Sequence, residues 1–140
     1  MTSRWLHGTL EILTIGLPFC AFKIVTGLIA LHTAFAPFGY ALLALGSVDL
    51  VLNALNLVAL VAARRRVTGV CLAEIVLRDR HELGLALDVF LSFSLVAAVV
   101  GLGLIGRIPG WAMPIWNFAV VLNVFGAGIG RLFSAVRRPA

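Results

Sequence analysis

The chain has 140 residues, of which 61% are hydrophobic and 12% are charged, and its formal net charge is +5. Soluble domains carry roughly twice that charged fraction, so the composition excludes a water-exposed exterior and indicates an integral membrane protein. The positive charge is better explained by membrane topology and contacts to anionic lipid headgroups than by nucleic-acid binding, so no nucleic-acid partner is expected.

Four apolar stretches are long enough to cross a bilayer, which takes about 20 mostly apolar residues in a helix. They cover Ile12–Thr33, Gly39–Ala63, Leu83–Ile105 and Pro114–Phe133. Only one connector between them is long, so the sequence predicts a single all-α domain over residues 1–140, a compact bundle of four transmembrane helices. A faint similarity between the two halves has two explanations, a tandem pair of helical hairpins or chance matching of apolar sequence.

The first stretch carries small residues and one lysine on a single helical face, because they recur at spacings of three and four. This face comprises Gly16, Cys20, Lys23, Gly27, Ala30 and Ala34. Small residues let helix backbones approach closely, so the face is predicted to pack against a neighbouring helix. Pro18 lacks a backbone N–H and predicts a kink in this helix.

The second stretch has a polar face as well, formed by Gly46, Asp49, Asn53 and Asn56. Lys23 and Asp49 stand equally far in sequence from Ala36, the centre of the intervening turn. They should therefore lie at the same depth near the middle of the membrane, and we predict a buried ion pair between them. The same construction places Glu11 level with Arg64. Asn53 and Asn56 are predicted to form hydrogen bonds across helices.

The connector Arg64–Glu82 interleaves apolar and charged side chains, with Glu74 and Arg78 one helical turn apart. This pattern predicts a short amphipathic helix at the cytoplasmic membrane surface. A docking site for a cytoplasmic partner is the functional alternative.

The second predicted hairpin places Asp88 of the third stretch level with Arg131 of the fourth. The fourth stretch also carries Asn123, Gly126 and Gly130 on one face, which predicts helix packing. Every acid in or beside a span thus has a base in its own hairpin. This favours ion pairs that fix helix register over a proton relay, because a relay needs a carboxylate without a permanent cation.

Arginines are concentrated on one side of the predicted spans, in the N-terminal segment, the connector and the C-terminal segment. Positive charge is enriched on the cytoplasmic side of membrane proteins, so both termini are predicted to be cytoplasmic. The alanine- and arginine-rich composition suggests a GC-rich bacterium, and the inner membrane is the expected location.

No catalytic constellation, metal-ligand spacing or cofactor-binding motif is recognisable, so we expect no enzyme activity, cofactor or metal. The favoured function is a non-catalytic subunit or scaffold of a membrane complex, packed against itself or a larger partner within the lipid bilayer. The alternative is a small ion- or proton-coupled transporter or channel that works as an oligomer, with the Lys23–Asp49 pair at its midplane.

Overall fold

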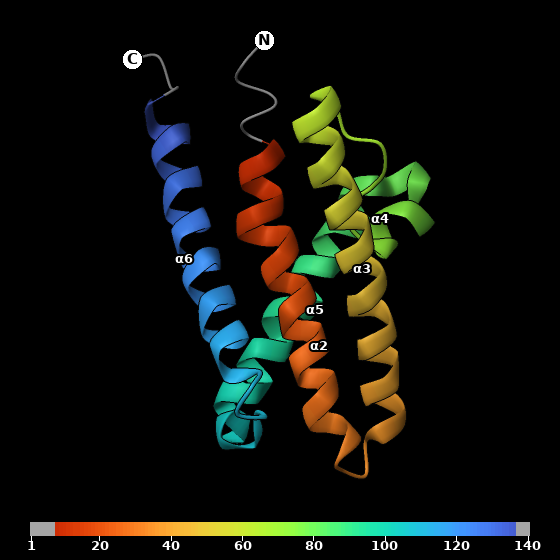
Figure 1. Cartoon of the computed structure of the whole chain (residues 1–140), viewed down its shortest axis with the longest axis vertical. Helices are drawn as coiled ribbons and strands as arrows, with labels where there is room; N and C mark the ends of the chain where they lie inside the picture. The colour runs from red at the N-terminus through yellow and green to blue at the C-terminus, as the bar shows by residue number, and fades with distance from the viewer. Residues whose placement is uncertain (1–7, 137–140) are drawn as a thin grey trace.

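The computed structural model describes residues 8–136, with side chains as far as residue 129. Within this part the chain is helical and contains no strand (Figure 1). A first helix, with a π-helical turn at Ile12–Gly16, continues into α2. The remaining elements follow in the order α2 (Leu17–Leu31), α3 (Ala36–Ala63), α4 (Leu72–Val76), η2 (Arg78–Arg80), α5 (His81–Gly101), η3 (Leu104–Arg107) and α6 (Met113–Val136).

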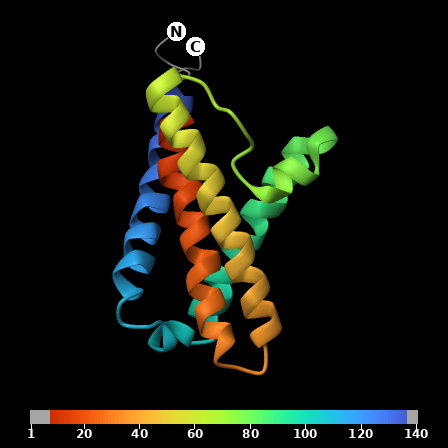
Figure 2. The same cartoon turned by 45° about the vertical axis from the view of Figure 1, so that its right-hand side comes forward.

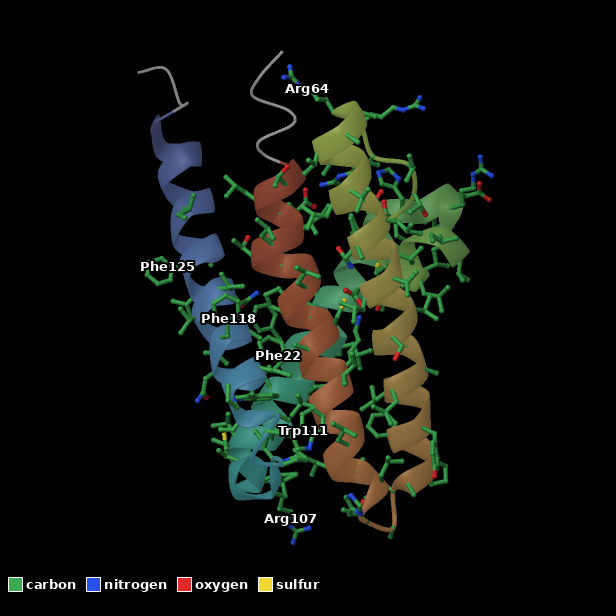
Figure 3. All side chains as sticks on the ribbon, viewed as in Figure 1. Phe22, Arg64, Arg107, Trp111, Phe118 and Phe125 are labelled. Carbon is green, nitrogen blue, oxygen red and sulfur yellow. The ribbon has the colours of Figure 1, made fainter. Side chains whose placement is uncertain are left out.

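Three helical segments are long and apolar enough to cross a membrane: Gly8–Leu31, Ala36–Ala63 and Arg78–Gly101. In α6 the apolar part described with side chains covers Met113–Ile129. Large apolar side chains cover the outer faces of these helices, and Phe125 of α6 points away from the rest of the protein (Figure 3). Such surfaces suit lipid better than water, which agrees with the predicted membrane class.

The helix α2 lies at the centre of the fold and contacts α3, α5 and α6. Its small residues allow a close approach to α3, as predicted. A Cβ atom added to Gly27 would lie 2.9 Å from the carbonyl oxygen of Gly39, and one added to Gly46 would lie 3.0 Å from Cβ of Lys23. Neither glycine has room for a larger residue, so the hairpin of α2 and α3 is held together at backbone distance.

The main apolar core fills the half of the protein opposite the connector. It brings together most of the length of α2, the end of α5 and the start of α6, and its buried residues are Phe19, Phe22, Val25, Ile29, Val99, Ile108, Ala112, Trp116 and Ala119. Phe22 and Trp116 meet edge-on with ring centroids 5.1 Å apart. Towards the connector, α5 leaves the other helices (Figure 2).

Pro18 lies just after a π-helical turn, Ile12–Gly16, in the first helix. Without an N–H, Pro18 cannot donate to the carbonyl oxygen of Thr14 four residues earlier. Asn123 of α6 donates to that oxygen instead, with an N–O distance of 3.2 Å. Gly126, one turn further along α6, packs directly on the Thr14 side chain. The freed carbonyl group therefore becomes an attachment point for α6.

The predicted short helix of the connector is present as α4, but the connector does not remain at the end of the helices. Its helix α4 has only five residues, and the chain before it turns back along α3 (Figure 2). The backbone N–H of Leu72 reaches Asp49, at the middle of α3. That position lies about 21 Å from Ala63, at roughly 1.5 Å per helical residue.

Candidate functional site

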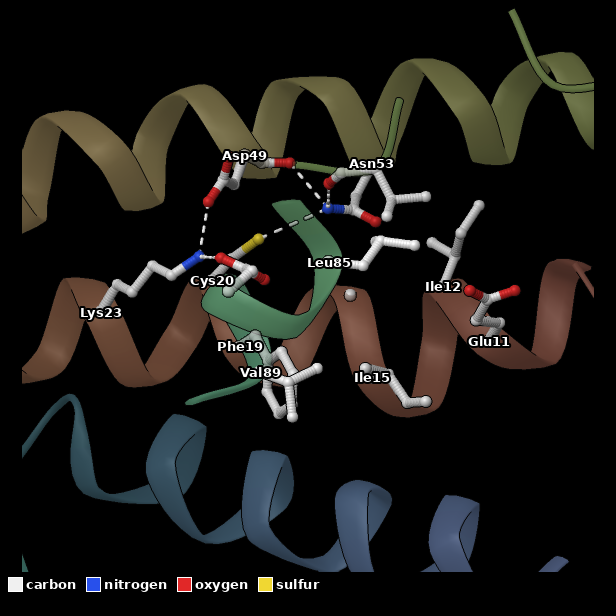
Figure 4. A pocket seen from close by; sticks show the side chains of 13 residues that line it. Glu11, Ile12, Ile15, Phe19, Cys20, Lys23, Asp49, Asn53, Leu85 and Val89 are labelled. Atoms are coloured by element: carbon white, nitrogen blue, oxygen red, sulfur yellow. Dashed lines mark hydrogen bonds and ion pairs between the residues drawn. The ribbon is translucent and has the colours of Figure 1, made fainter. Parts of the chain in front are cut away.

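Three charged side chains from three helices meet at the middle of the protein. Lys23 of α2 is completely buried, and its Nζ donates to Oδ2 of Asp49 in α3 at 2.5 Å. The same nitrogen donates to Oδ1 of Asp88 in α5. The contact between Lys23 and Asp49 follows the equal-depth argument from the sequence, and Figure 4 shows it among its surroundings.

Asp88 has a partner that was not predicted, because it binds Lys23 of the first hairpin. The side chain of Arg131, its predicted partner, lies outside the described residues. The depth argument treats the two hairpins separately, whereas α2 packs against α5 and brings an acid of the second hairpin to a base of the first.

The partner of Glu11 is also corrected. Its Oε2 lies 2.5 Å from Nη2 of Arg66, and no contact to Arg64 is found in the described part of the chain. Arg64 ends α3 in the left-handed conformation, with φ 53°. The turn at Arg64 leaves the Arg64 side chain exposed and directs Arg66 back to Glu11.

The two carboxylates differ in how completely they are paired. Asp49 uses both oxygens, because Oδ1 accepts the N–H of Leu72 at 2.6 Å, and its side chain is 1% exposed. Asp88 is 12% exposed, and its hydrogen bonding within the described residues involves Oδ1 alone. As far as the described side chains go, Asp88 therefore has an oxygen free to receive a proton or a ligand.

Two asparagines of α3 hold the returning connector, and Asn53 also makes the predicted bond across helices, because its Nδ2 donates to Sγ of Cys20 in α2 at 3.6 Å. Asn56 donates to the carbonyl oxygens of Thr68 and Gly69 at 3.1 and 3.0 Å. Its own oxygen accepts the N–H groups of Val67 and Thr68. Asn53 donates to the carbonyl oxygen of Val70 at 2.7 Å. These bonds satisfy the backbone of a segment that has no regular secondary structure.

Three buried polar atoms around the charged cluster have no hydrogen-bond partner in the part of the chain that the structure describes: Oδ1 of Asn53, Oγ1 of Thr26 and Oγ of Ser92. The amide oxygen of Asn53 faces Gly16, on the connector side of the charges (Figure 4). Thr26 and Ser92 lie one turn beyond Lys23 and Asp88, on the opposite side. The sequence analysis did not single out either hydroxyl, since serine and threonine in apolar helices have no distinctive pattern.

A cavity of about 230 Å³ reaches the charged cluster from the connector half. Glu11 lies at one end, and Lys23, Asp49 and Asp88 lie at the other. Most of the wall between them is apolar and comprises Ile12, Ile15, Phe19, Leu85, Val89 and Gly16. The core around Phe22 and Trp116 fills the opposite half, so the cavity approaches the charges from one side.

Both cysteines are buried and free. Burial raises the pKa of the Cys71 thiol in the connector to about 11, so it is neither a ready nucleophile nor a ready metal ligand. No group of three or more histidine, cysteine, aspartate or glutamate residues that could hold a metal ion occurs in the described residues.

The notable chemistry of this site is its charge balance. One lysine faces two carboxylates, and one of the carboxylates is open to a cavity, so the arrangement can bind a proton or a cation.

The packing of α6 against the first helix depends on Gly126, as predicted, while the surroundings of Gly130 lie outside the described side chains.

No protein-family model, curated protein or solved structure matches this chain.

Proposed function

We propose that this chain is a small transporter of a bacterial inner membrane, which exchanges a cation for a proton at Asp88. In this proposal α2, α3, α5 and α6 all cross the bilayer as one bundle. The 24 residues of α6 extend about 36 Å at roughly 1.5 Å per residue, which exceeds the ~30 Å of hydrocarbon. The arginine-rich end that carries the connector is cytoplasmic, opposite the end of Arg107 (Figure 3).

The observation that carries the proposal is that Asp49 and Asp88 share Lys23. Purely structural ion pairs would need a separate base for each acid, and Asp88 lacks one among the described residues. With all three groups ionised, the cluster has a net charge of −1. An uncompensated charge in the bilayer interior is costly, so a proton or a bound cation has to neutralise Asp88.

The shape of the protein supports exchange rather than static binding. The cavity reaches Asp88 from the connector half of the protein, while closely packed side chains around Phe22 and Trp116 fill the other half. Transporters work by giving a central site access to one side at a time. The unpartnered hydroxyls of Thr26 and Ser92 lie between the charges and the packed half, where an exit path would need polar groups.

A non-catalytic subunit of a membrane complex is the second candidate. Its support is that Gly101, Gly106 and Gly128 have no atom of another described residue within 4 Å of an added Cβ. Such glycines suit close packing against a partner helix.

The test of transport is a flux measurement in liposomes that enclose a pH-sensitive dye. An inward gradient of Na⁺, K⁺ or an organic ammonium ion should drive protons outward through the wild-type protein. Asp88→Asn should abolish this flux yet fold normally, since the Lys23–Asp49 pair remains neutral overall. Glu82→Gln is the matched control, because it removes one exposed carboxylate from the first turn of the same helix.

Proton flux that persists in Asp88→Asn, or no flux with any of these cations, would refute the transporter. Purification from the native membrane in mild detergent then distinguishes the second candidate. A larger protein that co-purifies in fixed stoichiometry would identify this chain as an accessory subunit.

A further inference from the structure

We infer that the cavity between α2, α3 and α5 binds a small primary or secondary amine, whose ammonium group pairs with Asp88 and whose apolar body lies against Ile15, Phe19 and Leu85. This inference rests on the proposed exchange at Asp88 and names the class of cation.

The cavity offers a free carboxylate oxygen, while its nitrogen donors already make hydrogen bonds. Asp88 has a second carboxylate oxygen beyond the one that binds Lys23, and that oxygen has no partner among the described residues. Oδ1 of Asn53 also accepts no hydrogen bond from these residues, but it is buried against Gly16. The nitrogen donors in the wall, Nζ of Lys23 and Nδ2 of Asn53, already donate to carboxylate and carbonyl oxygens. A complementary ligand is therefore positively charged and carries N–H donors.

The wall of the cavity favours an organic cation over a bare metal ion. Magnesium and calcium take about six or more oxygen ligands, and the cavity presents far fewer free oxygens. Its apolar residues would instead gain contact with a hydrocarbon group. The volume of about 230 Å³ lies below the roughly 300–1,000 Å³ typical of sites for drug-sized molecules, so the ligand is small.

Binding is coupled to a proton in a simple exchange. An ammonium ion enters, the carboxyl group of Asp88 loses its proton to water, and the resulting carboxylate pairs with the ammonium group. Within residues 8–129, the other titratable groups facing Asp88 are Lys23 and Cys20 from α2, Asp49 from α3 and Cys71 from the connector. Glu11 lies at the far end of the cavity. Because protons compete with the amine, its apparent dissociation constant should rise as the pH falls.

Isothermal titration of the whole protein in lipid nanodiscs tests the inference, with benzylammonium as the probe. Benzylammonium should bind with the release of one proton, measured from the dependence of the heat on buffer ionisation. Asp88→Asn should weaken binding by more than about 30-fold, as expected when one partner of a buried charge pair is lost. Glu82→Gln should bind as the wild type does.

Further ligands and one variant test each part of the recognition. Benzyl alcohol lacks the charge, and benzyltrimethylammonium lacks the N–H donors, so both should bind at least tenfold more weakly. Leu85→Phe keeps every charge but fills the cavity, and it should also weaken benzylammonium binding. Equal binding of benzyl alcohol and benzylammonium, or undiminished binding by Asp88→Asn, would overturn the inference.

The inference and the proposed function fail in different ways. Proton flux driven by Na⁺ or K⁺ and lost in Asp88→Asn, without benzylammonium binding, would overturn the amine site alone. Benzylammonium binding that depends on Asp88, without proton flux in liposomes, would support the amine site and refute transport.

Discussion

Lys23 carries a positive charge into the centre of an apolar protein, where it joins three helices through two carboxylates. Its alkyl chain packs beside Gly46, which leaves room for the side chain between α2 and α3. A buried ion pair contributes little net stability, because desolvation offsets the attraction. Removing one member is different, since the remaining charge stays buried without compensation.

Substitution of Lys23 separates a three-membered cluster from a simple pair. Lys23→Met leaves Asp49 and Asp88 without a cation and should lower the free energy of unfolding by about 3–5 kcal/mol. Asp88→Asn should leave stability unchanged or raise it, because the excess charge disappears. Unfolding in mixed detergent micelles, followed by circular dichroism, measures both effects.

Double and triple variants complete this prediction. Lys23→Met with Asp49→Leu should restore only part of the lost stability, because Asp88 remains buried without its base. Adding Asp88→Leu should restore most of the remainder. Full recovery in the double variant would show that Asp88 is not energetically part of the cluster.

At the scale of elements, the connector depends on side chains of α3 for its backbone hydrogen bonds. Asn56 alone makes four such bonds, two as donor and two as acceptor. Irregular backbone at membrane depth occurs only where protein or water satisfies its polar groups. The docked connector also covers Cys71, which is 2% exposed.

Alkylation of Cys71 reports whether the connector is docked. With a pKa of about 11, roughly one Cys71 thiol in 1,000 is ionised at pH 8, compared with about a quarter of ordinary thiols. Asn56→Leu should undock the connector and accelerate reaction with iodoacetamide at least tenfold, measured by peptide mass spectrometry. Leu55→Ala, at a lipid-facing neighbour, is the control. Equal rates in wild type and Asn56→Leu would contradict a connector held by Asn56.

The sequence predicts the helical class and the first hairpin well, because both follow from local patterns. The length of the apolar stretches predicts the long helices. Because the turn between α2 and α3 is short, residues at equal sequence distances from it lie opposite each other, as Lys23 and Asp49 do. Small residues spaced along one face predict where α2 meets α3. These inferences need no knowledge of the second hairpin.

The rest of the site depends on how the two hairpins meet, which periodicity does not encode. The second outer turn is long, since α5 ends at Gly101 and α6 begins at Met113. Equal sequence distances within one hairpin therefore do not predict that Asp88 lies beside Lys23 of the other. The bonds of Asn53 and Asn56 to the connector escaped prediction for a similar reason, because a connector that turns back along α3 has no helical or strand period.

At the scale of the whole molecule, α5 leans away from the other helices towards the connector and joins them again at the opposite end (Figure 2). The cavity occupies the open half, and the core around Phe22 and Trp116 occupies the closed half. If this arrangement is one state of a transporter, the charged cluster should be reachable by water from the connector side alone.

Accessibility of single cysteines in oriented vesicles tests this asymmetry. In a background with Cys20→Ala and Cys71→Ala, Ile15→Cys in the cavity wall should react with a membrane-impermeant maleimide from the connector side. Val58→Cys is the control, because Val58 is 67% exposed on α3 but faces the proposed lipid, where the reagent does not enter. Ser92→Cys, at a fully buried position beyond the charges, should stay unreactive from that side. An imposed proton gradient should make Ser92→Cys reactive from the other side as the closed half opens. Reaction of Ser92→Cys from both sides at once would instead indicate an open channel. If Ser92→Cys did not react with the maleimide under any gradient, that result would argue against alternating access.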